Sequence, residues 1–556
     1  MAASPGAAPI PWRWGDPHYR YPGDGRDRII AYLARWWGSP PAPRPIACLP
    51  LRLPASRLSE ADLRALAWMV PRGEVRHDDR SRLLESAGAS YLDMIRLRNQ
   101  QVPDVADGVV EPGATEEVEA VVRWADREGI ALVPRSGGTS VVGGVDPLRN
   151  GHRAVLVVSD RRLSNVGPIQ PERRKATFGA GVLGPELEAQ LWKSQLTLGH
   201  FPQSFERSAV GGWIAARSFG QASTRYQTPA DRLEGFTIVT PRGTVRWSRA
   251  NQPREFPDPG AVVPGSEGTL GVLVDATLRV EPLPPSTIWL AAIFPSWAAG
   301  VQAIRRIVSS SPLPAVLRLS DGSETDLTFA ESGWETGGRY ELLRRAAARF
   351  LRFRSEGPRR ACLMIASYEG SADDTKAGRR MFRAGRREAR GAYLPATVGH
   401  SWERSRFRPP YLRDDLVERN WFVETFETYV TWSALDHVNA AARASVTAWA
   451  HQQGARAYVG AHLSHPGTDG TSLYFTVIAP QKPGQEEASW YSFKQLTAEA
   501  VVSAGGTVSH HHGIGRFHRA WASRSLPRDW LEGLKTLKSR WDPNGIMNPG
   551  KTLPEG

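Results

Sequence analysis

Apolar residues recur along this chain with the two spacings that mark amphipathic helices and buried strands. Residues 27–37 predict a helix that Gly38 ends, and Ser59 predicts the N-cap of a second short helix after a Pro-rich linker at residues 40–54. A third helix is predicted from Thr115, because two glutamates follow it and suit a helix N-terminus. The apolar face of this third helix comprises Val118, Val121, Val122 and Ala125.

Apolar runs beyond these helices predict two sets of strands. The first set is 130–133, 154–158, 236–239 and 272–280, with a hairpin turn at 241–243. After a linker at 282–285, the predicted elements are strands at 289–294 and 362–368 and helices at 298–309 and 339–353. Residues before Trp12 are predicted to be disordered and residues 495–553 mostly helical. The fold class expected is α+β, with no internal repeat.

A chain of 556 residues is too long for one ordinary core, so several domains are expected. The predicted boundaries give an N-terminal tail and helical segment, a first α+β domain, an α/β cap domain and a helical C-terminal segment. In that order they cover residues 1–101, 102–284, 285–494 and 495–556.

Composition narrows the class of protein. Hydrophobic residues at 41% and charged residues at 23% are typical of a soluble globular chain and exclude overall disorder. The net charge of +13 favours an anionic partner, such as a phosphate substrate or an anionic bilayer, although solubility explains it equally well. Arginine is scattered, which argues against nucleic acid. Two cysteines, Cys48 and Cys362, exclude a disulfide framework and favour a reducing cytoplasm. No apolar run approaches the ~20 residues of a membrane span, so any membrane contact is expected to be peripheral.

A Gly-rich loop at residues 134–144 follows the predicted strand 130–133. Its small residues allow a tight turn that aims several N–H groups at one anionic ligand, typical of a diphosphate cradle. The loop lacks the Lys-Ser/Thr ending of a Walker loop and the Gly-x-Gly-x-x-Gly spacing of a Rossmann turn. A plain structural turn is an equally good interpretation of this loop alone. Two more small-residue blocks, at 210–213 and 265–271, favour the cradle.

Together the three blocks resemble the flavin domain of the vanillyl-alcohol-oxidase and p-cresol-methylhydroxylase superfamily, and within it the alkyldihydroxyacetone-phosphate synthase family. The resemblance covers nearly the whole chain, from Trp12-Arg13-Trp14-Gly15 through Asp78-Asp79-Arg80 to Asp542-Pro543-Asn544. The most family-specific pieces are Gly199-His200, Val210-Gly211-Gly212-Trp213, Arg318-Leu319, Tyr411-Leu412-Arg413-Asp414, Phe426-Glu427-Thr428 and Ser509-His510-His511-His512-Gly513-Ile514-Gly515. This resemblance implies a two-subdomain p-cresol-methylhydroxylase-type FAD-binding domain followed by the cap.

The same resemblance implies FAD as the cofactor. The position that is His in many covalently flavinylated relatives is Thr139 here, so noncovalent FAD is expected. The implied cofactor-binding residues are Pro134, Arg135, Ser136, Gly137, Gly138, Thr139, Ser140, Gln203, Ser208, Ala209, Ala216, Arg217, Ser218, Phe219, Gly265, Ser266, Glu267, Gly268, Thr269, Leu270 and Gly271.

The resemblance also assigns substrate-handling roles. Tyr474 matches the family's catalytic Tyr, and a phenol with a pKa near ~10 can exchange protons with a leaving carboxylate and an incoming alcohol. Arg413 matches a phosphate-binding Arg, for which a guanidinium fork is suited, and Arg318 matches another Arg important for activity. Without the resemblance, an ordinary strand aromatic is the commoner interpretation of a residue such as Tyr474.

The run His510-His511-His512 is the remaining catalytic candidate. In an extended segment neighbouring side chains alternate, so only His510 and His512 are expected to share a face, with one or two imidazoles working and the rest supporting. The metal-using branch of the superfamily has Glu where His511 stands and a ligand His where Tyr474 stands. No metal is therefore expected, although zinc on His462, His465 and His511 remains the minority alternative.

The function implied is exchange of the acyl chain of acyl-dihydroxyacetone phosphate for a fatty alcohol, which gives an ether lipid. The rival is an FAD-dependent oxidase or dehydrogenase of a hydroxylated small molecule. One departure bears on the choice, because the family's Ser-Thr before residue 210 is Ser208-Ala209 here. The partners expected are a small-molecule phosphate substrate, a long-chain alcohol and a second copy of the chain, with location in the cytoplasm or at a membrane periphery.

Overall fold

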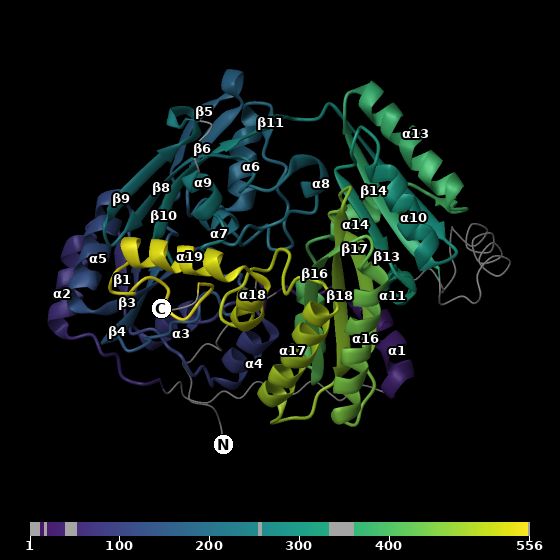
Figure 1. The fold of residues 1–556 in the computed structure, drawn as a ribbon. Helices are drawn as coiled ribbons and strands as arrows, with labels where there is room; N and C mark the ends of the chain where they lie inside the picture. The colour runs from purple at the N-terminus through teal and green to yellow at the C-terminus, as the bar shows by residue number, and fades with distance from the viewer. Residues whose placement is uncertain (1–11, 16–18, 39–52, 254–257, 333–360, 554–556) are drawn as a thin grey trace.

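The computed structural model describes residues 12–15, 19–38, 53–253, 258–332 and 361–553. They fold into two halves (Figure 1). The half whose sheets lie between residues 74 and 279 is called the flavin-side half, because the resemblance places the flavin there, and the half whose sheet lies between residues 286 and 480 is called the cap half. The expected tail before Trp12, the helix at 339–353 and nearly all of the linker at 40–54 lie outside the described residues. Among the described residues no helix is both long and apolar enough to cross a membrane.

Two sheets build the flavin-side half. The first has the order β1-β2-β4-β3, in which β2 and β3 run parallel to β4 and β1 is antiparallel to β2. The second is antiparallel with the order β5-β6-β10-β8-β9. Their strands are β1 Glu74–Arg76, β2 Gly108–Glu111, β3 Ile130–Arg135, β4 Ala154–Ser159, β5 Val166–Gln170, β6 Lys175–Gly179, β8 Leu233–Thr240, β9 Gly243–Ser248 and β10 Val272–Arg279. A short pair joins β7, Leu196–Thr197, to β11, Glu281–Pro282.

The cap half is built on one antiparallel sheet of seven strands, in the order β15-β12-β14-β13-β17-β18-β16. The strands are β12 Ser286–Phe294, β13 Val316–Ser320, β14 Cys362–Gly370, β15 Ala392–Leu394, β16 Trp421–Thr431, β17 Tyr458–Ser464 and β18 Gly470–Pro480. Each strand predicted from the sequence within the described residues is present, with bounds that differ by a few residues because strand ends carry little pattern.

Helices surround these sheets. On the flavin side they are α2 Glu60–Met69, α3 Asp79–Glu85, α5 Thr115–Glu128, α6 Gly184–Lys193, α7 Val210–Ala215, α9 Pro259–Val262 and α19 Arg528–Trp541. With the cap pack α1 Gly23–Trp37, α4 Tyr91–Asn99, α8 Ser223–Tyr226, α10 Trp297–Val308, α11 Gly322–Ser332, α13 Ala372–Glu388, α14 Thr397–Ser405, α15 Pro409–Val417, α16 Leu435–Gln452, α17 Glu486–Ser503 and α18 Arg519–Ser525.

Local sequence explains the helices that were predicted. Ser59 caps α2 by accepting the amide of Asp62, whose carboxylate accepts the Ser59 amide in return. The apolar face of α5 is buried against β3 and β8, and Gly129 ends this helix at φ 65°. Although α1 is first in the chain, it packs against α11 of the cap (Figure 1).

The end of the chain returns to the flavin-side half. There α19, drawn yellow, lies across that half (Figure 1), and the Leu132 amide donates to the Ile546 carbonyl. The boundary expected at residue 495 falls inside α17, which begins at Glu486 because Glu486 and Glu487 favour a helix start there. The His run lies in the loop between α17 and α18. This loop therefore spans from the cap back toward the flavin-side sheets.

Candidate active site

One cavity of about 1180 Å³ lies between the two halves and contains nearly all the predicted site residues. It is larger than the roughly 300–1,000 Å³ typical of a site for one drug-sized ligand, so it can hold a dinucleotide together with a substrate. The flavin-side wall is the loop after β3, and the cap wall comes from β13, β16, β17 and β18. Helices α1, α11, α14 and α15 complete the cap-side wall.

The loop after β3 has the conformation expected of a cradle. Gly138 has φ 64°, and a Cβ built on Gly137 would lie 2.1 Å from the Arg207 carbonyl oxygen, so glycine is required at both positions. The Arg135 guanidinium binds the Glu85 carboxylate at 2.5 Å and donates to the Ala87 carbonyl at 2.8 Å. The Arg135 guanidinium therefore holds the loop in place, and the groups that the loop offers to a ligand are mainly its backbone N–H groups.

Most of the other cofactor candidates also line this cavity. Those that do so outside the loop are Gln203, Ser208, Ala209, Ala216, Ser218, Phe219, Ser266, Glu267, Gly268 and Gly271. Four candidates do not: Arg217, Gly265, Thr269 and Leu270. Arg217 instead donates to the carbonyls of Pro264 and Ala261, and Leu270 is buried in the core below the second sheet. Their role in cofactor binding stays a prediction.

Asp160 is a cavity residue that sequence reasoning missed. It follows β4, is buried beside the Gly-rich loop and hydrogen-bonds with the Ser136 side chain. Burial raises the pKa of its carboxyl to about 7. A carboxyl that is partly protonated at neutral pH can donate a hydrogen bond to an anionic cofactor group. The signal was an Asp at the carboxyl end of a buried strand, beside the strand that carries the loop.

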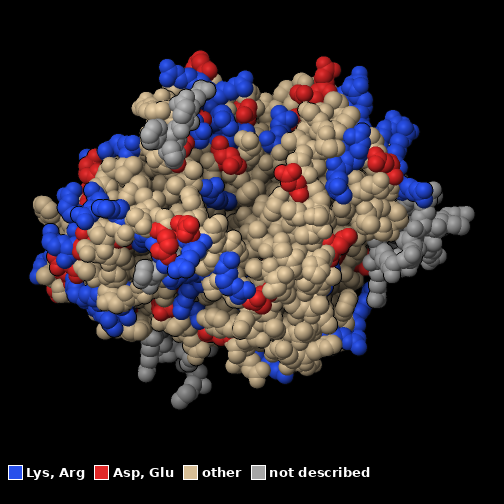
Figure 2. Space-filling model, in the orientation of Figure 1, with Lys and Arg blue, Asp and Glu red and all other residues tan. Residues whose placement is uncertain are grey.

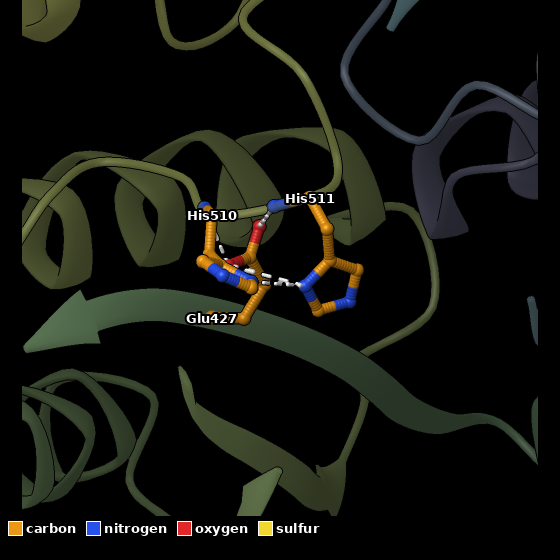
Figure 3. A group of neighbouring side chains, drawn as sticks. All are labelled: Glu427, His510 and His511. Carbon is orange, nitrogen blue, oxygen red and sulfur yellow. Dashed lines mark hydrogen bonds and ion pairs between the residues drawn. The ribbon is translucent and has the colours of Figure 1, made fainter. Parts of the chain in front are cut away.

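The His run is folded around a buried glutamate, Glu427 of β16. Its Oε1 accepts hydrogen bonds from the Ser509 hydroxyl at 2.8 Å and the amides of His511 and His512 at 3.1 and 3.0 Å, and its Oε2 accepts the His510 amide at 2.6 Å. Figure 3 shows His510 and His511 beside this carboxylate. Burial raises the pKa of Glu427, but the imidazoles and amides around it lower that pKa by more, so the carboxylate stays charged.

This loop changes which imidazoles reach the cavity. His511 and His512 line it, whereas the His510 ring packs on Phe219 at 4.1 Å and on Tyr429 at 5.9 Å. The expected pairing of His510 with His512 was wrong, because the segment curls around Glu427 instead of running extended. Burial lowers the pKa of His511 to about 4, so its imidazole is neutral and able to accept a proton at pH 7.

Tyr474 lies opposite this loop on β18, paired in register with Glu427 on one side and His462 on the other. Its ring stacks with His511 at 5.9 Å between centroids, and it hydrogen-bonds with the Thr425 side chain. Burial raises the pKa of the phenol to about 12, so Tyr474 is a proton donor at neutral pH.

The two predicted substrate arginines also line the cavity, but their partners differ. The Arg318 guanidinium is paired with the half-buried Glu324 carboxylate, which offsets its charge. The Arg413 Nη1 donates to the Ala89 carbonyl at 2.8 Å, and its Nε lies 3.6 Å from the Asp414 carboxylate. Arg413 is thus the better placed of the two to offer guanidinium N–H groups to a phosphate.

Side-chain atoms of Glu427, His510 and His511 lie within 4.8 Å of one another, which is close enough for a shared metal (Figure 3). Glu427 therefore supplies a carboxylate at this site, although the Glu of the metal-using branch is replaced by His511 in this chain. Its oxygens already accept four hydrogen bonds, however, so it serves first as the anchor of the loop. The alternative zinc site on His462, His465 and His511 has a similar difficulty, because the His462 Nδ1 already lies 3.2 Å from the Glu324 carboxylate.

We predict that chelation leaves both turnover and flavin content unchanged, because Glu427 and His462 already have protein partners. The check is dialysis against a chelator, followed by metal analysis and assay. Stoichiometric zinc or manganese whose removal abolishes activity would contradict this prediction.

Two protein-family models match this chain. Residues 106–249 match the family model described as FAD binding domain, and residues 283–552 match that of FAD linked oxidases, C-terminal domain. The fold and the cavity thus define an enzyme of the FAD-linked oxidase class, with FAD as its cofactor.

Similarity to individual proteins is more specific. The chain is 32% identical to alkyldihydroxyacetonephosphate synthase of Dictyostelium discoideum over 88% of this chain and 80% of the relative. It is 29% identical to the synthase of Trypanosoma brucei brucei over 90% and 82%. A solved alkyldihydroxyacetonephosphate synthase structure matches with TM-score 0.78 and 28% identity, covering 94% of this chain and 91% of that one. The chain belongs to the alkyldihydroxyacetonephosphate synthase family.

Proposed function

We propose that this protein exchanges the acyl chain of acyl-dihydroxyacetone phosphate for a fatty alcohol and so forms an ether lipid. The observation that carries the proposal is the convergence of neutral imidazoles and a protonated phenol, His511, His512 and Tyr474, in the cavity that the Gly-rich loop borders. A base and an acid on one cavity wall suit a reaction in which a carbon-bound proton leaves and a carboxylate departs.

The protein's own groups divide this work. His511 or His512 takes the proton from C1 of the substrate, and Tyr474 donates a proton to the departing carboxylate. When bound, FAD would supply an electrophilic ring for the exchange at the substrate carbon. The loop at 134–140 would hold its diphosphate, and the protein otherwise contributes orientation and proton transfer. The net exchange needs no external electron acceptor.

The test of the function uses purified protein with acyl-dihydroxyacetone phosphate and a labelled long-chain alcohol. We expect labelled ether product and released fatty acid in equal amounts, with no lasting loss of flavin absorbance. Bleaching of the flavin by an alcohol substrate, without ether formation, would replace the proposal with the oxidase or dehydrogenase function.

We predict that the FAD is bound without a covalent link, because Thr139 lines the cavity where a linking histidine would have to stand. Acid precipitation should release all of the flavin into the supernatant, where its absorbance is measured. Colour that stays in the washed pellet would contradict the prediction.

We predict that Arg413→Lys weakens binding of the phosphate substrate about tenfold or more, because a charged side chain remains but the guanidinium fork is lost. KM for acyl-dihydroxyacetone phosphate should rise while kcat changes little. Arg419→Lys is the control, since Arg419 donates to the Asp415 carbonyl outside the cavity lining. Equal KM values in the two variants would remove Arg413 from phosphate binding.

The setting of the enzyme is also part of the proposal. The positive net charge would favour a phosphate substrate and contact with an anionic membrane surface from the cytoplasm. Lys and Arg are interspersed with Asp and Glu on the face shown in Figure 2, which favours a loose association over one dense basic patch. Assembly with a second copy is testable by light scattering.

A further inference from the structure

A second glutamate, Glu267, binds the loop that carries the His run, and it does so from the flavin-side half. This loop, residues 504–518 between α17 and α18, is called the His loop. The Ile514 amide donates to Glu267 Oε1 at 2.5 Å, and the Gly515 amide donates to Glu267 Oε2 at 2.7 Å. The family resemblance implies a cofactor contact for Glu267, but both oxygens of its side chain accept hydrogen bonds from the His loop.

The backbone on both sides of this contact is shaped to allow it. Glu267 has φ 49°, a left-handed conformation that a residue other than glycine adopts at a cost, and such strain is typical of functional positions. A Cβ built on Gly513 would lie 2.6 Å from Glu267 Oε1, and one built on Gly515 would lie 2.3 Å from the Val142 carbonyl oxygen. A side chain at either position would push the His loop away, which explains the two glycines that follow the His run.

The backbone of Glu267 is itself fixed beside the Gly-rich loop. The Asn548 side-chain amide donates to the Glu267 carbonyl at 2.7 Å and to the Gly144 carbonyl at 3.0 Å. The amides of residues 516 and 517 donate to the Val142 carbonyl at 3.0 and 3.1 Å. The end of the His loop is thus joined to the two backbone segments that border the flavin side of the cavity.

Two carboxylates from opposite halves therefore hold the same loop. Glu427, on the cap strand β16, accepts the amides of residues 510–512, and Glu267 accepts those of residues 514 and 515. Glu427 fixes the imidazoles relative to Tyr474, its register partner on β18. Glu267 fixes them relative to the flavin-side wall. Proton transfer needs both positions to be correct, because the substrate must engage the cofactor and the base at the same time.

We propose that Glu267 is a positioning residue for the proton transfer at C1, which holds the His511 and His512 imidazoles at a fixed place relative to the flavin-side wall. It acts through the His loop and takes no proton itself, so the proton balance of the exchange is unchanged. Its side chain thereby has a role in placing the base instead of binding the cofactor. This inference rests on the proposed function and deepens it.

The experiment compares Glu267→Gln with Glu117→Gln in the FAD-loaded protein. Gln keeps the size of the side chain but has one acceptor oxygen and one NH₂ group, so one of the two loop amides would face a donor. Glu117 on α5 is the matched control, since each of its oxygens also accepts one backbone amide at 2.7 Å, outside the cavity lining. We expect C1 proton exchange to fall about tenfold in Glu267→Gln only, with KM and FAD content unchanged.

Two further readouts distinguish a displaced base from a general loss of stability. In residue-resolved hydrogen exchange, the Ile514 and Gly515 amides should lose protection in Glu267→Gln, whereas the amides of residues 510–512 should keep theirs on Glu427. With substrate deuterated at C1, the isotope effect on ether formation should increase in Glu267→Gln and not in Glu117→Gln. The reason is that removal of the C1 proton becomes the slow step when the imidazoles are misplaced.

Three results would overturn the positioning role: wild-type C1 exchange in Glu267→Gln, an equal loss in Glu117→Gln, or an unchanged isotope effect in Glu267→Gln. Recovery of C1 exchange on addition of excess FAD would also overturn it and would assign Glu267 to cofactor binding. All of these results leave ether formation by the wild-type protein intact. Absence of ether product from the wild-type protein would instead refute the proposed function itself.

Discussion

Tyr474→Phe is expected to lower ether formation by ~10²-fold or more, the scale of a lost general acid. The substitution removes one hydroxyl from a half-buried strand position and keeps the ring that stacks on His462 and His511. Without the phenol, the departing carboxylate must leave unprotonated into a largely apolar cavity, which is unfavourable. Fatty acid release should therefore slow together with ether formation, whereas exchange of the C1 proton, which the imidazoles carry out, should persist.

The structure offers a matched control for this substitution. Tyr368 on β14 belongs to the same cap sheet, is fully buried, and has a hydroxyl without a hydrogen-bond partner among the described residues. Tyr368→Phe should keep wild-type turnover because that hydroxyl does not face the chemistry. Fatty acid release at wild-type rate in Tyr474→Phe would show that another group donates the proton.

The sequence predicted the scaffold because helices and strands leave local signals. The apolar spacing in residues 115–128 predicts which face of a helix is buried, and the structure has α5 there. The continuous apolar runs at 130–133 and 154–158 are typical of strands buried on both faces, and the structure has β3 and β4 there. The Gly-rich loop was equally readable, because glycine is required where the backbone turns tightly.

Pairings between distant residues could not be predicted in the same way. Glu427 precedes His510 by 83 residues and Glu324 precedes His462 by 138, so no local spacing links them. The assumption that neighbouring histidines alternate failed because an outside carboxylate sets the loop's shape. A usable signal did exist, since Glu424 and Glu427 are the only charged residues at 421–430 in a mostly buried strand, and buried carboxylates require partners.

Because Glu427 anchors the His run, Glu427→Gln is expected to have the second large effect, a loss of C1 proton exchange. A carboxamide has one oxygen and one NH₂ group, so it cannot accept all four hydrogen bonds that Glu427 accepts, and its NH₂ would meet backbone donors. The loop should lose its fixed shape and carry His511 and His512 away from the substrate. Exchange of the C1 proton should fall about 10²-fold or more, with FAD still bound by the flavin-side loop.

In Glu427→Gln, a loss of folding stability must be distinguished from a displacement of the His511 and His512 imidazoles, because leaving buried amides unpaired costs about 1–3 kcal/mol per group. Glu424→Gln is the matched control: it removes another buried carboxylate of β16, one that binds the Trp490 indole instead of the His run. Both variants should unfold at lower denaturant concentration, but only Glu427→Gln should lose C1 proton exchange at temperatures where both remain folded. Equal exchange rates in the two would mean that the histidines hold their positions without Glu427, and the anchoring role assigned to this carboxylate would be wrong.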